Sequence, residues 1–158
     1  MTYLTTGLRA LCALLLLGLS AALAEDAALG PTEPLTIVAR TGRHAFAVEV
    51  MRTDAERSRG LMYRRSMAPE HGMLFDFQAV APVAMWMKNT YLPLDMLFIR
   101  ADGSIAKIAA DTEPLSTKVI PSNEPVLSVL ELNAGTAARL KLHAGDRVEH
   151  PLFGAKAR

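Results

Sequence analysis

Cysteine is almost absent from this chain of 158 residues, which contains one, Cys12. It lies in the apolar segment near the N-terminus. The rest of the chain has no thiol for a disulfide, a thiolate metal site or a cysteine nucleophile. The sequence therefore excludes cysteine chemistry from its main domain, and it predicts a domain that tolerates an oxidising compartment.

Net charge is also close to zero. The chain has 17 basic and 16 acidic residues, and Arg9 is the single charged residue among the first 24. Without that segment the two signs balance. A neutral chain carries no general electrostatic footprint for nucleic acid or for an anionic membrane. We therefore predict neither as a partner.

The usual catalytic signatures are missing as well. No Gly-x-Ser-x-Gly, His-Glu-x-x-His or phosphate-binding glycine loop occurs. The four histidines are too scattered for a helical metal pair, and we interpret each as a surface or turn residue. The sequence thus predicts no metal and no cofactor. It names no reaction and leaves enzymatic activity uncertain.

Long apolar runs are confined to the N-terminus. Arg9 precedes an uncharged run, Ala10–Ala24, that ends in the small-x-small site Ala22-Leu23-Ala24. This pattern is typical of a cleaved secretory signal. The alternative is a retained anchor, but the run is shorter than the roughly 20 residues that a spanning helix needs. Cys12 comes at the start of the run, whereas a lipoprotein cysteine would follow it. We predict a periplasmic or secreted monomer without a membrane anchor.

The domain organisation follows from these limits. We assign residues 1–24 to the signal peptide, 25–34 to a linker, 35–150 to one domain and 151–158 to a C-terminal tail. The length that remains after cleavage suffices for one domain with a real hydrophobic core. We find no internal repeat.

Short apolar runs between turn signals predict many strands. In the second predicted strand, Phe46, Val48 and Val50 alternate with other residues and share a face. A capping box at Thr53 predicts a helix from Asp54 to about Arg64, with Gly60 inside it because another backbone approaches. A second short helix should end at Leu142, and a proline-rich loop should span Asp111 to Pro125. The fold class is mainly β, a β-rich sandwich or barrel with two short helices. The predicted strands are Leu35–Ala39, His44–Met51, Met73–Phe77, Val83–Met87, Leu94–Ile99, Ser104–Ala109, Val126–Leu132 and Arg147–Glu149.

Several of these segments carry a family resemblance. In order, they are Arg59-Gly60-Leu61-Met62, Gly72-Met73-Leu74-Phe75, Trp86-Met87-Lys88-Asn89-Thr90 with Pro93-Leu94-Asp95, Val129-Leu130-Glu131-Leu132 with Gly135, and Gly145-Asp146. The chain resembles the family known as domain of unknown function 192 over about residues 35–149. The resemblance implies a compact, mostly β domain that is often exported, and it implies no activity.

The most informative stretch is Met85–Asp95. It gathers Trp86, Lys88, Asn89 and Thr90 beside apolar strands. Polar groups in such a place need partners, and a cluster of them at a strand end predicts a ligand pocket.

Two carboxylates join this cluster. Strand alternation places Asp95 and Glu131 each at one end of an otherwise apolar face. A carboxylate there must be paired or strongly hydrogen-bonded. One interpretation is a buried ion pair, above all Lys88 with Asp95, or a backbone clamp that fixes the turn at 89–93. The other makes the same groups the wall of a ligand cleft with Trp86 as its floor.

The segment 52–65 is rich in arginine. Guanidinium groups bind carboxylate or phosphate oxygens through paired hydrogen bonds. We interpret four of the five arginines as a solvated helix face, and we expect the fifth, Arg59, to point into the domain because it adjoins Gly60. The five are Arg52, Arg57, Arg59, Arg64 and Arg65.

The leading hypothesis is a binding module for a small polar or anionic ligand. One alternative is a hydrolase that uses Asp95 and Glu131 as an acid/base pair on a glycan. Others are a purely structural accessory domain, and a Cu(I) site built from methionines, for which ordinary core packing is the simpler account. The predicted ligand-binding residues are Arg59, Trp86, Lys88, Asn89, Thr90, Asp95 and Glu131.

Overall fold

The computed structural model describes residues 30–154. The predicted signal peptide lies outside the described residues. Within them, no helix is both long and apolar enough to cross a membrane. The elements are β1 (Thr32–Ala39), β2 (Gly42–Met51), α1 (Asp54–Arg59), β3 (His71–Met85), β4 (Leu94–Ile99), β5 (Ile105–Thr112), β6 (Ile120–Asn133), α2 (Thr136–Leu140), β7 (Arg147–Glu149) and the short 3-10 helix η1 (Pro151–Phe153).

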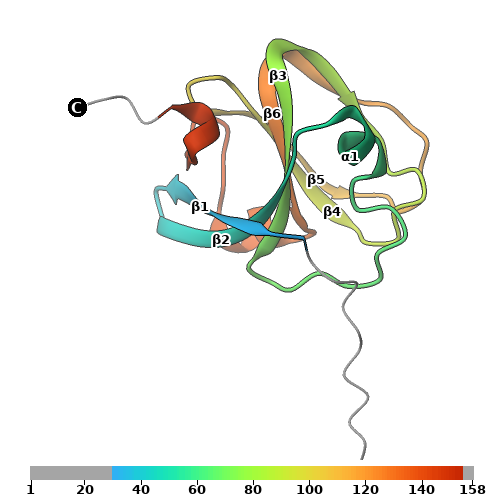
Figure 1. Ribbon diagram of the computed structural model, residues 1–158. Coiled ribbons are helices and arrows are strands. Elements are labelled where there is room, and N and C mark those ends of the chain that lie inside the picture. The colour runs from blue at the N-terminus through green and yellow to red at the C-terminus, as the bar shows by residue number, and fades with distance from the viewer. Residues whose placement is uncertain (1–29, 155–158) are drawn as a thin grey trace, which may run out of the picture.

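One curled sheet contains all the strands of the described region. Its order is β5-β4-β6-β3-β2-β1-β7, and only β2 and β3 are parallel. The two edge strands meet, because the N–H of Val148 donates to the carbonyl of Gly103 at 2.7 Å and Ser104 bridges to Arg147. The sheet thus curls round on itself (Figure 1). The predicted fold class, mainly β with two short helices, is confirmed.

Helix α1 begins as the sequence predicts and ends earlier. The hydroxyl of Thr53 accepts from the N–H of Glu56, whose carboxylate accepts from the N–H of Thr53 in return. The predicted extension to Arg64 is wrong, since the helix stops at Arg59. Gly60 is its C-cap, with φ 45° and ψ −136°. A Cβ at Gly60 would lie 3.0 Å from the ring of Phe75, so a side chain, rather than the expected backbone, approaches it.

Strand β3 is one bent strand of 15 residues, where the sequence predicts two. Its pairing with β6 shifts register after Asp76, where Gln78 has φ 61°. The carboxylate of Asp76 accepts from the N–H of Gln78 at 2.8 Å, which stabilises this irregularity without ending the strand.

The predicted proline-rich loop is shorter than expected, because β6 already begins at Ile120. Pro121 and Pro125 pair with β3, while β4 pairs with β6 only from Ser128 onward. A proline has no N–H to donate, so it is tolerated where one side of the strand has no neighbouring strand. The prolines therefore mark a two-stranded arm.

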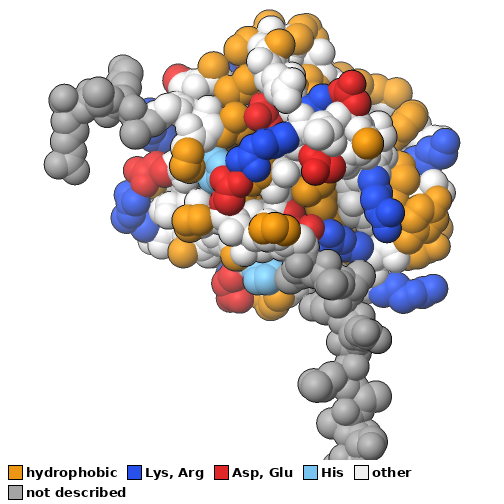
Figure 2. Space-filling view, in the orientation of Figure 1, with side chains coloured by type: hydrophobic (Ala, Val, Ile, Leu, Met, Phe, Trp, Pro, Cys, Tyr) orange, Lys and Arg blue, Asp and Glu red, His pale blue; other side chains and the backbone are white. Residues whose placement is uncertain are grey.

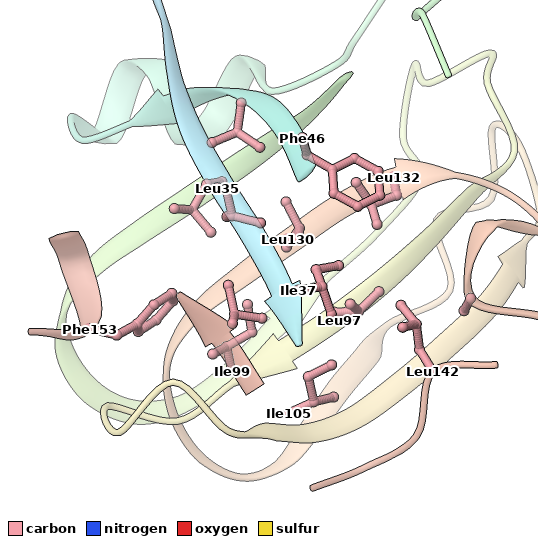
Figure 3. Packing of buried hydrophobic residues seen from close by; sticks show 14 of the residues in the cluster. Leu35, Ile37, Phe46, Leu97, Ile99, Ile105, Leu130, Leu132, Leu142 and Phe153 are labelled. Carbon is pink, nitrogen blue, oxygen red and sulfur yellow. The ribbon is translucent and has the colours of Figure 1, made fainter. Parts of the chain in front are cut away.

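Two hydrophobic cores lie on opposite faces of the sheet. Along β6, Leu130 and Leu132 face the first core, and Val129 faces the second. Figure 3 shows the first core, where side chains of β1, β2, β4 and β6 meet, together with Phe153 from the segment predicted as a tail. The second core consists of Leu61, Met67, Met73, Phe75, Met87, Leu94, Met96, Phe98, Val126 and Val129. The candidate site lies at the second core.

Candidate functional site

A cleft of about 200 Å³ opens at the edge of the second core. The end of α1 and the residues after it form one wall, β3 and the turn after it form the other, and β6 contributes Glu131. The volume corresponds to about seven water molecules in the liquid. The lining residues are Arg57, Ser58, Arg59, Gly60, Leu61, Met62, Phe75, Phe77, Ala84, Met85, Trp86, Lys88, Thr90 and Glu131.

The first wall depends on the end of α1. The N–H of Gly60 donates to the carbonyl of Glu56 at 2.8 Å, and the N–H of Met62 donates to that of Arg59 at 3.0 Å. This turn buries Leu61, which is 2% exposed, in the second core. Arg59 remains exposed on the wall of the cleft. Our expectation that Arg59 points into the domain is therefore wrong.

Arg64 is the arginine of this segment that pairs inside the domain. Its guanidinium binds both carboxylate oxygens of the buried Glu49, at 2.5 and 2.7 Å. This forked pair holds the segment after α1 against β2. In the sequence Arg64 looks like the rest of the basic cluster, because its partner lies 15 residues away in another element.

The opposite wall is a tight turn after β3. Met87 is fully buried and anchors the turn, and its carbonyl accepts from the N–H of Thr90 at 3.0 Å. The turn presents Trp86, whose surface is 50% exposed, and Lys88, whose ammonium lies 5.6 Å from the indole ring. Trp86, Lys88 and Thr90 all line the cleft, as the sequence predicts.

Asn89 shapes this turn and does not line the cleft. It has φ 57°, its carbonyl accepts from the N–H of Tyr63 at 2.9 Å, and its amide approaches the sulfur of Met62 at 3.8 Å. Asparagine tolerates the left-handed region better than most residues. Its observed contacts are therefore those of a structural residue.

Glu131 is the buried polar group of the cleft. It stands on β6 directly between Met73 of β3 and Met96 of β4, and it is 4% exposed. Within residues 30–154 no hydrogen bond or ion pair satisfies its carboxyl group. Burial raises the pKa of Glu131 to about 8. At pH 7 the group is therefore mostly neutral and can donate a hydrogen bond.

The basic residues of the cleft differ in their hydrogen bonds and ion pairs. Arg57 donates to two backbone carbonyls and pairs with Asp54. Arg59 and Lys88 form no ion pair with any residue that the structure describes. Two exposed cations therefore stand on the solvent side of a buried neutral acid.

Asp95 lies away from the cleft, which corrects its prediction as a ligand-binding residue. It is fully buried and accepts from the N–H of Asp111 at 2.9 Å and from that of Ala137 at 2.7 Å. The predicted pair with Lys88 is wrong, since the described residues contain no such ion pair. The backbone clamp is the correct alternative, although it fixes β5 and α2 rather than the turn at 89–93.

The register also separates the two carboxylates. Asp95 is paired with Leu132, whose side chain faces the first core, whereas Glu131 is paired with Met96, which faces the second. Side chains on opposite faces of a sheet cannot act on one bond. The acid/base pair of the hydrolase hypothesis is therefore wrong.

The methionines mostly fill space. Met67, Met73, Met87 and Met96 belong to the second core, and only Met62 and Met85 line the cleft. Core packing accounts for the first four. No group of three or more His, Cys, Asp or Glu residues in the described part of the chain could hold a metal ion.

Comparisons with known proteins identify relatives without a known activity. The model of the family DUF192, described as uncharacterised ACR, matches residues 36–150. No curated protein matches. One similar solved structure is a protein described as a candidate transcription regulator from Sinorhizobium meliloti 1021, with 52% identity and a TM-score of 0.75 over 77% of this chain and 95% of its own. Another is a protein of unknown function from Novosphingobium aromaticivorans DSM 12444, with 40% identity and a TM-score of 0.74 over 75% of this chain and 85% of its own.

Proposed function

Because the chain belongs to the DUF192 family, whose description assigns no activity, we propose a function from the cleft itself: it binds a small anionic ligand. One observation carries the proposal. Glu131 is a buried carboxyl group without a partner among the described residues, and it lines a cleft whose exposed cations, Arg59 and Lys88, are also unpaired.

A purely structural role accounts poorly for Glu131. A carboxyl group among apolar neighbours costs free energy to bury, and the structure gives this one no protein partner within residues 30–154. The neighbours of Glu131 in the sheet, Met73 and Met96, are apolar. A methionine or leucine would fill the position without the free-energy cost of burying a carboxyl group. A ligand that accepts a hydrogen bond from Glu131 would account for the carboxyl group.

The walls define the ligand. An anionic group would bind between Arg59 and Lys88, since guanidinium and ammonium groups both donate to carboxylate and phosphate oxygens. An acceptor atom on the ligand would accept a hydrogen bond from the neutral carboxyl group of Glu131. An apolar portion would pack on Trp86 and on the buried surface of Leu61 and Phe75. The volume of about 200 Å³ limits the enclosed part to a small molecule or a single residue-sized group.

Binding is favoured over catalysis by the hydroxyl groups of the cleft. Ser58 and Thr90 line it, and the hydroxyl of Thr90 already donates to the carbonyl of Lys88 at 3.3 Å. A serine or threonine nucleophile needs a base within hydrogen-bond distance. No base contacts either hydroxyl within residues 30–154.

Fluorescence titration tests the proposal, because Trp86 is the one tryptophan of the chain. The probes are acetate, lactate, succinate and inorganic phosphate, with glucose as the neutral comparison, and calorimetry serves as a second readout. We expect at least one anion to change the emission, and Glu131→Met, which removes the hydrogen-bond donor, and Lys88→Met to weaken the apparent affinity for that anion at least fivefold. Anions that change neither emission nor heat would refute the proposal.

A matched pair of variants controls for charge. Arg59 and Arg139 are both exposed and both stand in the last turn of a short helix, but only Arg59 lines the cleft. Arg59→Gln should weaken the anion response at least fivefold, whereas Arg139→Gln should leave it within twofold. If both variants weaken the anion response equally, the response reflects general charge attraction, and the cleft is not the binding site.

The proposal includes export of a monomer. Residues 1–24 carry the pattern that supports export. Intact-mass measurement on protein recovered from the expressing cell should give a species that begins at Glu25, and size-exclusion chromatography should give the monomer mass. A species that begins at Met1 and sediments with membranes would contradict this part.

A further inference from the structure

An exposed apolar surface adjoins the cleft. Tyr63, Tyr91 and Leu115, which are 58%, 40% and 55% exposed, form what we call the apolar patch. The rings of Tyr63 and Tyr91 meet edge to face, with centroids 6.3 Å apart. The N–H of Leu115 donates to the carbonyl of Thr90 at 3.0 Å, which holds Leu115 beside the same turn.

Two residues of the apolar patch have strained backbones. Tyr63 has φ 66° and Leu115 has φ 64°, a region that bulky side chains rarely adopt. Both are held there by hydrogen bonds to the turn, from the N–H of Tyr63 to Asn89 at 2.9 Å and from that of Leu115 to Thr90. The side chains of Tyr63 and Leu115 nevertheless remain exposed. Strained residues that expose large apolar groups indicate a recognition surface rather than packing.

The surroundings of the apolar patch are basic. The guanidinium of Arg65 lies 5.3 Å from the ring of Tyr91, and Lys88 and Arg59 stand at the adjoining cleft. None of the three forms an ion pair within the described part of the chain. Glu113 is the one acidic residue of the loop 113–119 that carries Leu115. On the side of the molecule beyond α1, Lys and Arg side chains surround hydrophobic ones (Figure 2).

Neighbouring residues of the same two segments of the chain contribute to both the cleft and the apolar patch. Met62 and Thr90 line the cleft, and their chain neighbours Tyr63 and Tyr91 belong to the apolar patch. Tyrosine, tryptophan, arginine and methionine are the residues enriched at binding interfaces. A ligand whose end fills the cleft would therefore continue over the apolar patch.

We propose that the cleft and the apolar patch together bind an extended acidic peptide segment. An acidic side chain or chain end enters the cleft, and an apolar side chain of the peptide lies on the patch. This inference rests on the proposed function, and it names the ligand class. The planes of Tyr63 and Tyr91 are inclined by 69° and Leu115 is aliphatic, so the patch offers no flat platform for a sugar ring. The basic surroundings select acidic sequences.

Selection from a random decapeptide display library tests the proposal with the purified protein. We expect enrichment of peptides that combine Asp or Glu with apolar residues. Fluorescence anisotropy of a selected peptide should show at least tenfold weaker binding for Tyr91→Ser and Leu115→Ser. Val80→Ser is the matched control, because Val80 is 56% exposed and does not line the cleft, and it should bind within twofold. Circular dichroism establishes that each variant is folded.

Three results would overturn the inference. They are no enrichment of acidic peptides, equal peptide binding by the patch variants, and patch-dependent binding to phosphatidylglycerol vesicles without any peptide binding. The experiments also distinguish failure of the peptide proposal from failure of the proposed anion binding. Loss of peptide binding with an intact response to small anions overturns only this inference. Absence of any anion response overturns the proposed function and the placement of an acidic group in the cleft.

Discussion

Two buried carboxyl groups, one on each face of the sheet, differ in their hydrogen-bond partners. On the face of the first core, Asp95 is fully enclosed and accepts two backbone N–H groups. On the face of the second core, Glu131 is almost as buried but has no partner within the described residues, and it borders a cleft. Burial alone therefore does not distinguish Asp95, which stabilises the fold, from Glu131, for which we propose a role in binding. The partners do, and each face makes its own prediction.

The largest effect is expected on the first face. Asp95→Ala leaves the buried N–H of Ala137 and the partly buried N–H of Asp111 without their acceptor, and each such loss costs about 1–3 kcal/mol. We expect the free energy of unfolding to fall by about 3–5 kcal/mol in urea denaturation. Asp95→Asn keeps one acceptor oxygen and should lose about half as much. The anion response of Trp86 should persist in Asp95→Asn, and its loss would place Asp95 in the binding site.

The second face predicts a pH dependence of stability. The pKa of Glu131 is raised to about 8 in the folded protein, above its ordinary 4.5. As the pH rises, the unfolded chain therefore loses the proton of Glu131 at a lower pH than the folded protein does. The contribution of Glu131 to stability is complete below about pH 4.5 and is lost as the pH rises towards 8.

Glu131→Gln isolates this effect, because glutamine does not ionise. Between pH 5 and pH 8 the free energy of unfolding of the unmodified protein should fall by about 2–4 kcal/mol relative to the variant, allowing for water in the cleft. Urea denaturation at both pH values measures the difference. Other titrating groups, including the buried His150, contribute equally to both proteins and cancel. Parallel pH profiles would show that Glu131 is solvated or paired.

Much of the fold follows from residues close in sequence, whereas the difference between the two faces does not. The run Leu94–Ile99, apolar except for Asp95, matches β4, and the capping box at Thr53 starts α1 as predicted. Both depend on residues that are close in sequence. The partners of Asp95 are 16 and 42 residues away, so its pattern in the sequence resembles that of Glu131. Only the register of β4 with β6 reveals that the two carboxylates face opposite cores.

The cleft itself was partly predictable. The sequence singles out Arg59, Trp86, Lys88, Thr90 and Glu131, all of which line it. The sequence pattern does not single out Phe77 and Ala84, because the irregular pairing of β3 with β6 that brings them to the cleft leaves no periodic signal. The sequence also predicts Asn89 and Asp95, because a polar residue near a site has the same pattern whether it shapes the site or lines it.

A smaller effect is expected where the second face meets α1. Gly60→Ala places a Cβ 3.0 Å from the ring of Phe75 in a backbone region that favours glycine. We expect a loss of about 2–3 kcal/mol in stability and a weaker anion response, since both residues line the cleft. Gly145→Ala is the control, with φ 95° and no atom within 4 Å of the added Cβ. Its strain alone should cost about 1–2 kcal/mol, and equal losses would show that the contact with Phe75 relaxes.

The smallest effect tests whether the two faces are independent. Lys88 is exposed at the cleft, Asp95 is enclosed on the opposite face, and no ion pair joins them within residues 30–154. Lys88→Met should therefore change the free energy of unfolding by less than about 1 kcal/mol, as for a surface cation. Combined with Asp95→Asn, the two changes should add within about 0.5 kcal/mol, because residues without shared partners behave independently. A coupling of several kcal/mol in this double-mutant cycle would restore the buried pair that the sequence predicts and remove the contrast between the faces. Additive changes, together with an anion response that only Lys88→Met weakens, would assign stability to Asp95 and recognition to Lys88.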